Sequence, residues 1–144
     1  MTKVMTVSLL AGLAKPGIQA EMVTHVKKTK GSAACFDSPS WYEVVYQGRK
    51  LVGSAQTRKH GVILQHGSVP FIRDGKNLFS VLKIKNEELR ERLAQSFKRQ
   101  ACGLNEILGR EISYAEAVEA FAQGFAEALG VTLEKQELTS REQE

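Results

Sequence analysis

Residues 35–67 read CFDSPSWYEVVYQGRKLVGSAQTRKHGVILQHG, and this stretch decides how the rest of the chain can fold. Two runs with β-forming residues, 41–46 and 50–56, flank a short turn in which Gly48 can take a left-handed conformation. A third run follows at 61–72 and ends in turn-forming residues. The stretch therefore predicts a β-meander at the centre of the chain.

Helices are expected on both sides of this meander. Residues 2–14 place apolar side chains at helical spacing, and a Pro-Gly pair at 16–17 ends the pattern. After the meander, Asn86 can cap a helix that ends before Gly103 and carries apolar side chains at every fourth position. These patterns place helical segments next to a sheet.

The last helix has the clearest signals at both of its ends. Ser113 and Glu116 have the spacing of a capping box, and Gly130 has the position of a helix stop. Its apolar face is expected to consist of Val118, Phe121, Phe125 and Leu129. Short strands are predicted within 18–26 and 131–137, so the predicted class is α+β, with a mixed or antiparallel sheet and packed helices.

Length and composition indicate one globular domain. The chain has 144 residues, of which 42% are apolar, and this is enough for a hydrophobic core without disulfide bonds or structural metal ions. Cys35 and Cys102 stand far apart and outside any ligand cluster, so neither a disulfide framework nor a metal site is predicted. No apolar run reaches the roughly 20 residues that span a bilayer, and residues 1–14 lack a clean signal-peptide cleavage site. We therefore predict a cytoplasmic protein that does not bind membranes.

The basic charge of the chain is mild. Its formal net charge is +4, and basic residues cluster at 27–30 and at 49–59. Such clusters fit an acidic protein partner or a solvated face. A nucleic-acid partner is not expected, because the basic residues lack interleaved aromatic side chains that could stack on bases.

The central stretch holds two candidate reactive groups. Cys35 follows a basic loop whose charge favours a thiolate nucleophile, although a lone cysteine also fits a small buried apolar residue. Lys50 precedes Gly53-Ser54-Ala55, where the backbone can approach a ligand closely. A lysine beside exposed N–H groups suits a carbonyl or phosphate oxygen, although a solvated strand lysine would have the same sequence.

The histidines and the second cysteine give weaker signals. His66-Gly67 follows an apolar run and can place an imidazole in the same cleft, as a base or a hydrogen-bond donor, or it can be a structural histidine. His25 and His60 have charged neighbours and are predicted at the surface. Cys102 has apolar neighbours and is predicted to be a buried core residue.

The order and spacing of these elements are more specific than any one of them. The segments CFDSPSWYE, GRKLVGSAQTR and GVILQHGS resemble the lipoate-protein ligase A family, which has the biotin/lipoate ligase catalytic domain. The resemblance is greatest to the cysteine-dependent octanoyltransferases of that family. It extends through residues 79–81 and into both C-terminal helices.

This resemblance implies a reaction and roles for the candidate residues. Cys35 would accept octanoyl from acyl carrier protein as a thioester and pass it to a lysine of a lipoyl-carrier protein, either the glycine cleavage H protein or an E2 lipoyl domain. Lys50 would stabilise the oxyanion of each tetrahedral intermediate. The acyl cleft would be formed by Gly53, Ser54, Ala55, His66 and Gly67. No cofactor is implied.

Two other functions remain open at this point. An ATP-dependent lipoate-protein ligase would use Lys50 but not the thiol of Cys35. A non-catalytic fragment would bind a lipoyl carrier without acyl transfer. The fragment is considered because the family also has an N-terminal half with an Arg-Arg-x-x-Gly-Gly-Arg-x-x-x-His type motif, which this sequence lacks.

Residues 1–144 are accordingly expected to form the C-terminal part of a biotin/lipoate ligase-type domain. The N-terminal half could be supplied by another chain. A sheet without its neighbouring strands would expose an apolar edge, so the resemblance leaves activity of the chain by itself open.

Overall fold

The computed structural model describes residues 3–24 and 42–143, and it has the predicted α+β architecture. The strands form one antiparallel sheet in the order β1-β2-β3-β4. They are β1 (Glu21–Met22), β2 (Val44–Tyr46), β3 (Arg49–Lys59) and β4 (Val62–Ser68). The helices are α1 (Lys3–Ala14), α2 (Gly75–Ser80), α3 (Glu87–Gln100), α4 (Leu104–Leu108) and α5 (Tyr114–Leu129).

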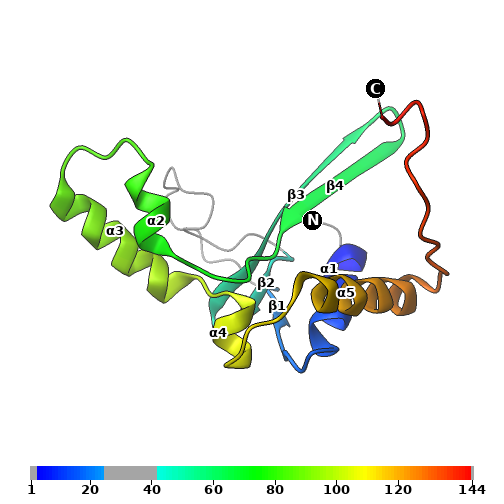
Figure 1. Ribbon diagram of the computed structural model, residues 1–144, viewed down its shortest axis with the longest axis horizontal. Coiled ribbons are helices and arrows are strands. Elements are labelled where there is room, and N and C mark those ends of the chain that lie inside the picture. The colour runs from blue at the N-terminus through cyan, green and yellow to red at the C-terminus, as the bar shows by residue number, and fades with distance from the viewer. Residues whose placement is uncertain (1–2, 25–41, 144) are drawn as a thin grey trace.

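The arrangement of these elements leaves the long β3–β4 hairpin standing out from the body (Figure 1). Helices α1 and α5 lie side by side near the base of the hairpin, and α2 and α3 form a separate pair at the opposite end of the molecule. None of the helices within residues 3–24 and 42–143 is long and apolar enough to cross a membrane.

The predicted meander is confirmed, although its third strand, β4, ends at Ser68 and not near residue 72. Two tight turns fix its register. Gln47 and Gly48 both have positive φ, 48° and 74°, as a two-residue hairpin turn requires. His60 and Gly61, with φ of 50° and 76°, connect β3 to β4 in the same way. The register of β2 against β3 shifts at Val44, which marks a bulge or irregularity near the start of the hairpin.

Two hydrophobic clusters hold the fold. The larger one joins the base of the sheet to the first and last helices and to α4, and its buried members are Leu13, Ile18, Val44, Leu51, Val52, Cys102, Leu104, Ile112 and Ala117. The smaller cluster lies between α2 and α3. There the Phe79 and Phe97 rings meet edge to face, with centroids 5.8 Å apart. Helices α2 and α3 therefore form a unit with its own small core.

The predicted packing face of α5 is partly wrong. Val118 and Leu129 are 48% and 40% exposed, whereas small residues of α5, including Gly124, are buried. A Cβ on Gly124 would lie 2.1 Å from the backbone nitrogen of Gly12, so the two helices meet almost backbone to backbone. Close approach of α1, rather than large apolar side chains, selects the buried face.

Most helix signals are confirmed. The Asn86 side chain accepts a hydrogen bond from the backbone N–H of Leu89, and the Ser113 hydroxyl accepts one from that of Glu116. Gly130 ends α5 in the left-handed conformation, with φ of 64°.

Three expectations for short segments need correction. Residues 131–137 form no strand, because no described strand pairs with them. The strand predicted within 18–26 is only the two-residue β1, and its prediction beyond residue 24 lies outside the described residues. The turn expected after residue 72 is instead the start of α2, where the Asp74 side chain accepts a hydrogen bond from the backbone N–H of Asn77 and caps the helix.

Candidate functional site

The candidate nucleophile cannot be placed from the structure. Cys35 and the basic loop before it lie outside the described residues. The structure does place the other predicted site residues, which all belong to β3 and β4. The geometry of these two strands therefore defines the candidate site.

Lys50 is a buried charge at the start of β3. Its side chain is 5% exposed, and its Nζ donates a hydrogen bond to Oε1 of Glu43 at 2.8 Å. Glu43 comes just before β2 and is itself only 7% exposed. A buried ammonium group is tolerated when it is paired and hydrogen-bonded. Lys50 is therefore not the solvated strand lysine that its sequence also allowed.

The backbone of Lys50 is tied to the end of α3. Its carbonyl oxygen accepts a hydrogen bond from the N–H of Cys102 at 3.0 Å, and Lys50 forms an isolated parallel bridge with Ala101. These contacts fix the backbone of Lys50, and the hydrogen bond to Glu43 orients its side chain.

The two small-residue segments of the predicted cleft lie directly opposite each other. Ala55 pairs with His66 and Ser54 pairs with Gly67 in the β3–β4 register. A Cβ on Gly67 would lie 2.6 Å from the carbonyl oxygen of Gly53, so glycine is required at this crossing. The sequence segments GSA and HG, which are separated by ten residues, therefore form one surface.

One edge of this part of β3 has no strand partner in the described part of the chain. Strand β2 pairs with β3 only as far as Val52, whereas β4 pairs with it from Gly53 to Lys59. In an antiparallel strand, alternate N–H groups point to opposite edges. Some N–H groups beyond Val52 therefore point away from β4.

A cavity of about 230 Å³ lies between the hairpin and the α1–α5 pair. Its lining combines apolar helix side chains with residues of the two strands: Met5, Leu9, Val52, Ser54, Gln65, His66, Gly67, Val69 and Phe125. The cavity therefore contains three of the predicted cleft residues. An apolar wall with a few polar groups suits a ligand with an aliphatic part.

Lys50 does not line this cavity, because it lies at the other side of Val52, toward the base of the sheet. The charged group and the apolar cavity are therefore adjacent along β3 but separate.

The remaining candidates have mixed outcomes. His60 lies exposed in a turn, as predicted, and His25 is outside the described residues. His66 is also exposed. Cys102 is confirmed as a core residue, with its Sγ 3.7 Å from the carbonyl oxygens of Arg49 and Lys50. Burial raises the pKa of the Cys102 thiol, which keeps it protonated and unreactive at neutral pH.

Glu43 is the site residue that sequence reasoning missed. It lies within the quoted CFDSPSWYE segment, but nothing local distinguishes it from a surface carboxylate. The available signal was its place beside two valines that start a buried strand, because Lys50 lies opposite Val45 across the two-residue turn. Glu43 is thus a diagonal neighbour of Lys50 in the hairpin, and an acidic and a basic residue in this relation can form a pair.

The chain is similar in sequence to proteins of one family. The family model described as the lipoyl protein ligase A/B catalytic domain matches residues 2–126. Octanoyltransferase LipM of Kyrpidia tusciae is 47% identical, with 99% of this chain and 54% of that protein covered. Octanoyltransferase LipM of Bacillus subtilis is 40% identical, with 97% and 53% covered. The chain thus spans about half the length of these curated relatives.

Solved structures show the same fold. The bipartite lipoate protein ligase of Thermoplasma acidophilum matches with a TM-score of 0.76 at 21% identity, covering 98% of this chain and 49% of that one. A lipoate-protein ligase A with bound ATP matches with a TM-score of 0.71 at 19% identity, covering 98% and 50%. At these identities the likeness concerns the fold alone.

Proposed function

The chain belongs to the lipoyl protein ligase A/B catalytic domain family, and from this premise we propose that it takes part in octanoyl transfer in protein lipoylation. The donor would be octanoyl-acyl carrier protein. The acceptor would be a lysine of a lipoyl-carrier protein, either the glycine cleavage H protein or an E2 lipoyl domain. The observation that carries this proposal is the 47% identity to an octanoyltransferase over 99% of this chain.

The reaction has two acyl-transfer steps. The thiolate of Cys35 attacks the donor thioester carbonyl, a tetrahedral intermediate forms, and its collapse expels the carrier as a thiolate, which takes up a proton from water. The ε-amine of the acceptor lysine then attacks the Cys35 thioester, and loss of the thiolate and a proton leaves an amide. Neither step needs ATP, a metal or a resident cofactor.

Lys50 is proposed to stabilise the oxyanion in both steps. A buried ammonium acts more strongly on developing negative charge than an exposed one, because less water screens the interaction. Its hydrogen bond to Glu43 holds it in place before the reaction, so little reorganisation is needed. The neighbouring apolar cavity beside Ser54 and Gly67 would receive the aliphatic part of the acyl group.

The site is proposed to need the other half of the domain, supplied by the same polypeptide or by another chain. Strand β4 is an edge strand of the sheet that the described residues form, and Val62, Ile63 and Leu64 on it are 68%, 54% and 59% exposed. Apolar side chains on an open edge favour pairing with further protein. This half-site would operate in the cytoplasm, where the acyl donor is made.

Intact-mass measurement with octanoyl-acyl carrier protein tests the proposal. With the N-terminal half of a LipM relative added as a separate chain, we expect a hydroxylamine-labile octanoyl adduct on the unmodified chain and on Cys102→Ala, but not on Cys35→Ala. Without that half, we expect little or no adduct on any of the three. An adduct that forms equally on Cys35→Ala would refute the assignment of the nucleophile.

The role of Lys50 has a separate measurement. Lys50→Met should slow adduct formation by about 10²–10³-fold, the usual effect of removing an oxyanion-stabilising group. Lipoate-dependent pyrophosphate release that persists in Cys35→Ala would instead indicate the ATP-dependent ligase reaction.

A further inference from the structure

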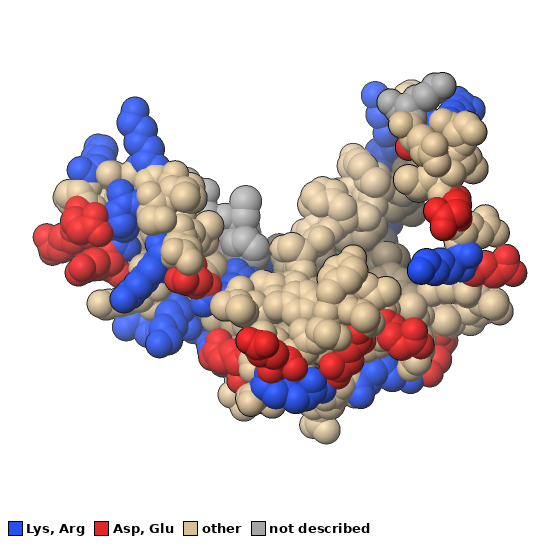
Figure 2. Space-filling model, in the orientation of Figure 1, with Lys and Arg blue, Asp and Glu red and all other residues tan. Residues whose placement is uncertain are grey.

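The pair α2 and α3, with the segment that joins them, is one of the basic parts of the chain. Residues 73–99 contain eight Lys or Arg and four Asp or Glu, a difference of +4, and residues 1–72 contain nine and three, a difference of +6. Residues 101–144 contain three basic and nine acidic residues, a difference of −6. Figure 2 shows Lys and Arg side chains over the α2–α3 end of the molecule. This unit, residues 73–100, is thus electropositive relative to the C-terminal residues 101–144.

Two of its cations have structural roles. The Arg73 guanidinium lies 5.1 Å from the centre of the Phe97 ring, and its Nε donates a hydrogen bond to the Cys102 carbonyl. Arg90 pairs with Glu87 and donates hydrogen bonds to the carbonyl oxygens of Phe79 and Leu82. These two arginines link α3 to the segments before and after α2 and to the residues that follow α3.

The other six cations of the unit are exposed, and none of them forms an ion pair with a residue that the structure describes. They are Lys76, Lys83, Lys85, Arg92, Lys98 and Arg99. Exposed cations that form no ion pair within the described residues are available to a partner.

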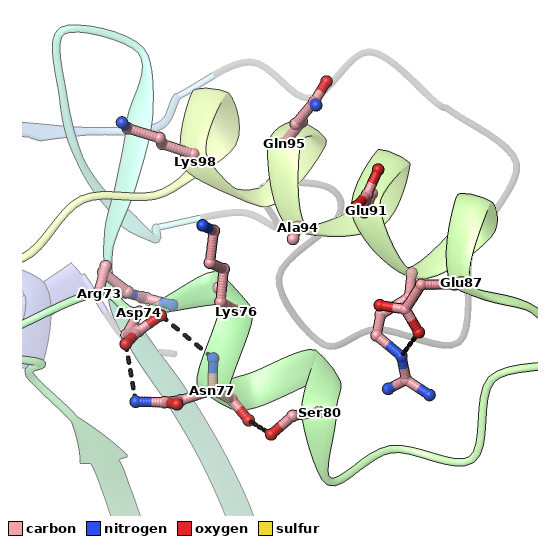
Figure 3. A pocket seen from close by; sticks show the side chains of 12 residues that line it. Arg73, Asp74, Lys76, Asn77, Ser80, Glu87, Glu91, Ala94, Gln95 and Lys98 are labelled. Carbon is pink, nitrogen blue, oxygen red and sulfur yellow. Dashed lines mark hydrogen bonds and ion pairs between the residues drawn. The ribbon is translucent and has the colours of Figure 1, made fainter.

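Two of these cations line a groove of about 840 Å³ between α2 and α3. Lys76 and Lys98 lie at the end of the groove next to Arg73, whereas Glu87 and Glu91 lie toward its other end (Figure 3). The sequence explains this polarity, since Lys76 begins α2, and Lys98 is in the last turn of the antiparallel α3.

The acidic residue nearest this basic end is already engaged. Both carboxylate oxygens of Asp74 accept hydrogen bonds from Asn77, one from its backbone N–H at 3.1 Å and one from its side-chain amide at 2.7 Å. Asp74 caps α2 and keeps its negative charge, because both donors are neutral amides. Arg73, Lys76 and Lys98 outnumber it at this end of the groove, so the basic end has a net positive charge.

The basic end of the groove is also the end nearest the candidate site. Helix α3 runs into Ala101, which forms the bridge with Lys50. In Figure 1 the α2–α3 unit stands beside the sheet and not over the β3–β4 hairpin. A protein bound there would be next to the site without covering it.

We infer that the basic end of this groove is the docking site for the acidic acyl carrier protein that donates the acyl group. The inference rests on the proposed function, which requires such a donor. Acyl carrier proteins are acidic, so their charge complements Lys76 and Lys98. They also present the acyl group on a long flexible arm, which lets the protein dock beside the site. An acceptor lysine has only its own four-carbon stem and must bind directly over the thioester.

Charge reversal at the groove tests this docking site. The double variant Lys76→Glu/Lys98→Glu is compared with Lys135→Glu/Arg141→Glu, which makes the same change in net charge at exposed positions of the C-terminal segment. Binding of fluorescently labelled holo-acyl carrier protein is measured by anisotropy at low and at high salt. We expect the groove variant to weaken binding about tenfold or more at low salt, and the control to change it less than about twofold.

The probe carries no acyl group, so the result does not depend on acyl transfer. Cys35→Ala should bind the carrier like the unmodified chain even if the proposed chemistry is wrong. Lys76→Gln/Lys98→Gln, which introduces no repulsion, should give an intermediate loss and guards against misfolding of the glutamate variant. Equal weakening by both double variants, or no weakening by either, would overturn the inference. So would a loss of binding to a lipoyl domain while carrier binding is retained.

Discussion

Replacing Glu43 by Gln tests whether the buried ion pair holds the centre of the candidate site. Glutamine has nearly the same shape, but it removes the negative charge 2.8 Å from the Lys50 ammonium. Both side chains are less than one-tenth exposed, so water cannot replace the lost interaction. Removing one partner of a buried pair typically costs about 3–5 kcal/mol. This is a large share of the roughly 5–15 kcal/mol that stabilises a typical domain.

The same strand provides a matched control. Arg49 pairs with Glu106 at 2.5 Å, but these side chains are 25% and 51% exposed. Glu106→Gln should therefore cost only about 0–1 kcal/mol, the usual range for a surface pair. Urea unfolding of the full chain, followed by circular dichroism and extrapolated to water, measures both variants. If the two losses differ by less than about 1 kcal/mol, the proposed contrast between buried and exposed pairs is wrong.

A double replacement separates the ion pair from simple packing. Glu43→Leu/Lys50→Met removes both charges and keeps apolar volume in the same space. Because desolvation of the two charges is also removed, most of the stability lost in Glu43→Gln should return. The double variant lacks the group proposed to stabilise the oxyanion. Relative to Glu43→Gln, it should therefore be more stable but form the adduct more slowly.

Two further predictions follow from buried contacts. Gly124→Ala should destabilise the chain by about 1–3 kcal/mol, because its Cβ forces α1 away, whereas Gln123→Ala on the exposed side of α5 should change stability by less than about 0.5 kcal/mol in the same urea assay. The Cys102 thiol should resist iodoacetamide in the folded chain at neutral pH, and it should react faster only as the pH approaches its raised pKa. Peptide mass spectrometry measures the labelling. Rapid labelling of the folded chain at neutral pH would contradict the burial of this thiol.

The signals that predicted structure correctly were local ones. The turn at Gln47-Gly48 and the caps at Asn86 and Ser113 depend on residues within a few positions of each other. Turn and cap chemistry of this kind can be recognised in a single sequence. Helices α2 and α4, of 6 and 5 residues, were missed because they are too short to show a helical period.

The errors concern contacts between distant segments. The buried face of α5 depends on Gly12, which is far away in sequence and has no side chain that would produce a hydrophobic pattern. Residues 131–137 have a strand-like composition, but a strand also needs a partner, which the described sheet does not provide. In both cases tertiary packing determines the structure, and local preference does not.

The candidate site shows the same division. Lys50 and the paired segments Gly53–Ala55 and His66–Gly67 could be identified from the order of motifs along the chain, and the roles proposed for them stay predictions. Glu43 could not, because its contact with Lys50 depends on the hairpin register and on burial. A charge partner inside a core is visible only after the fold is known.

The backbone contact between Lys50 and the end of α3 gives the two proposals a common geometry. A helix of 14 residues is about 20 Å long at a rise of about 1.5 Å per residue, so the two ends of the α2–α3 unit lie at very different distances from Lys50. Lys98 is three residues from Ala101, whereas Glu87 is at the far end. The positive end of the groove is the end nearer to Lys50, so an acidic carrier is attracted to the end from which its acyl group has the shorter distance to cross. The placement of basic residues near the C-terminus of α3 and acidic residues near its N-terminus therefore suits delivery of the acyl group to Lys50.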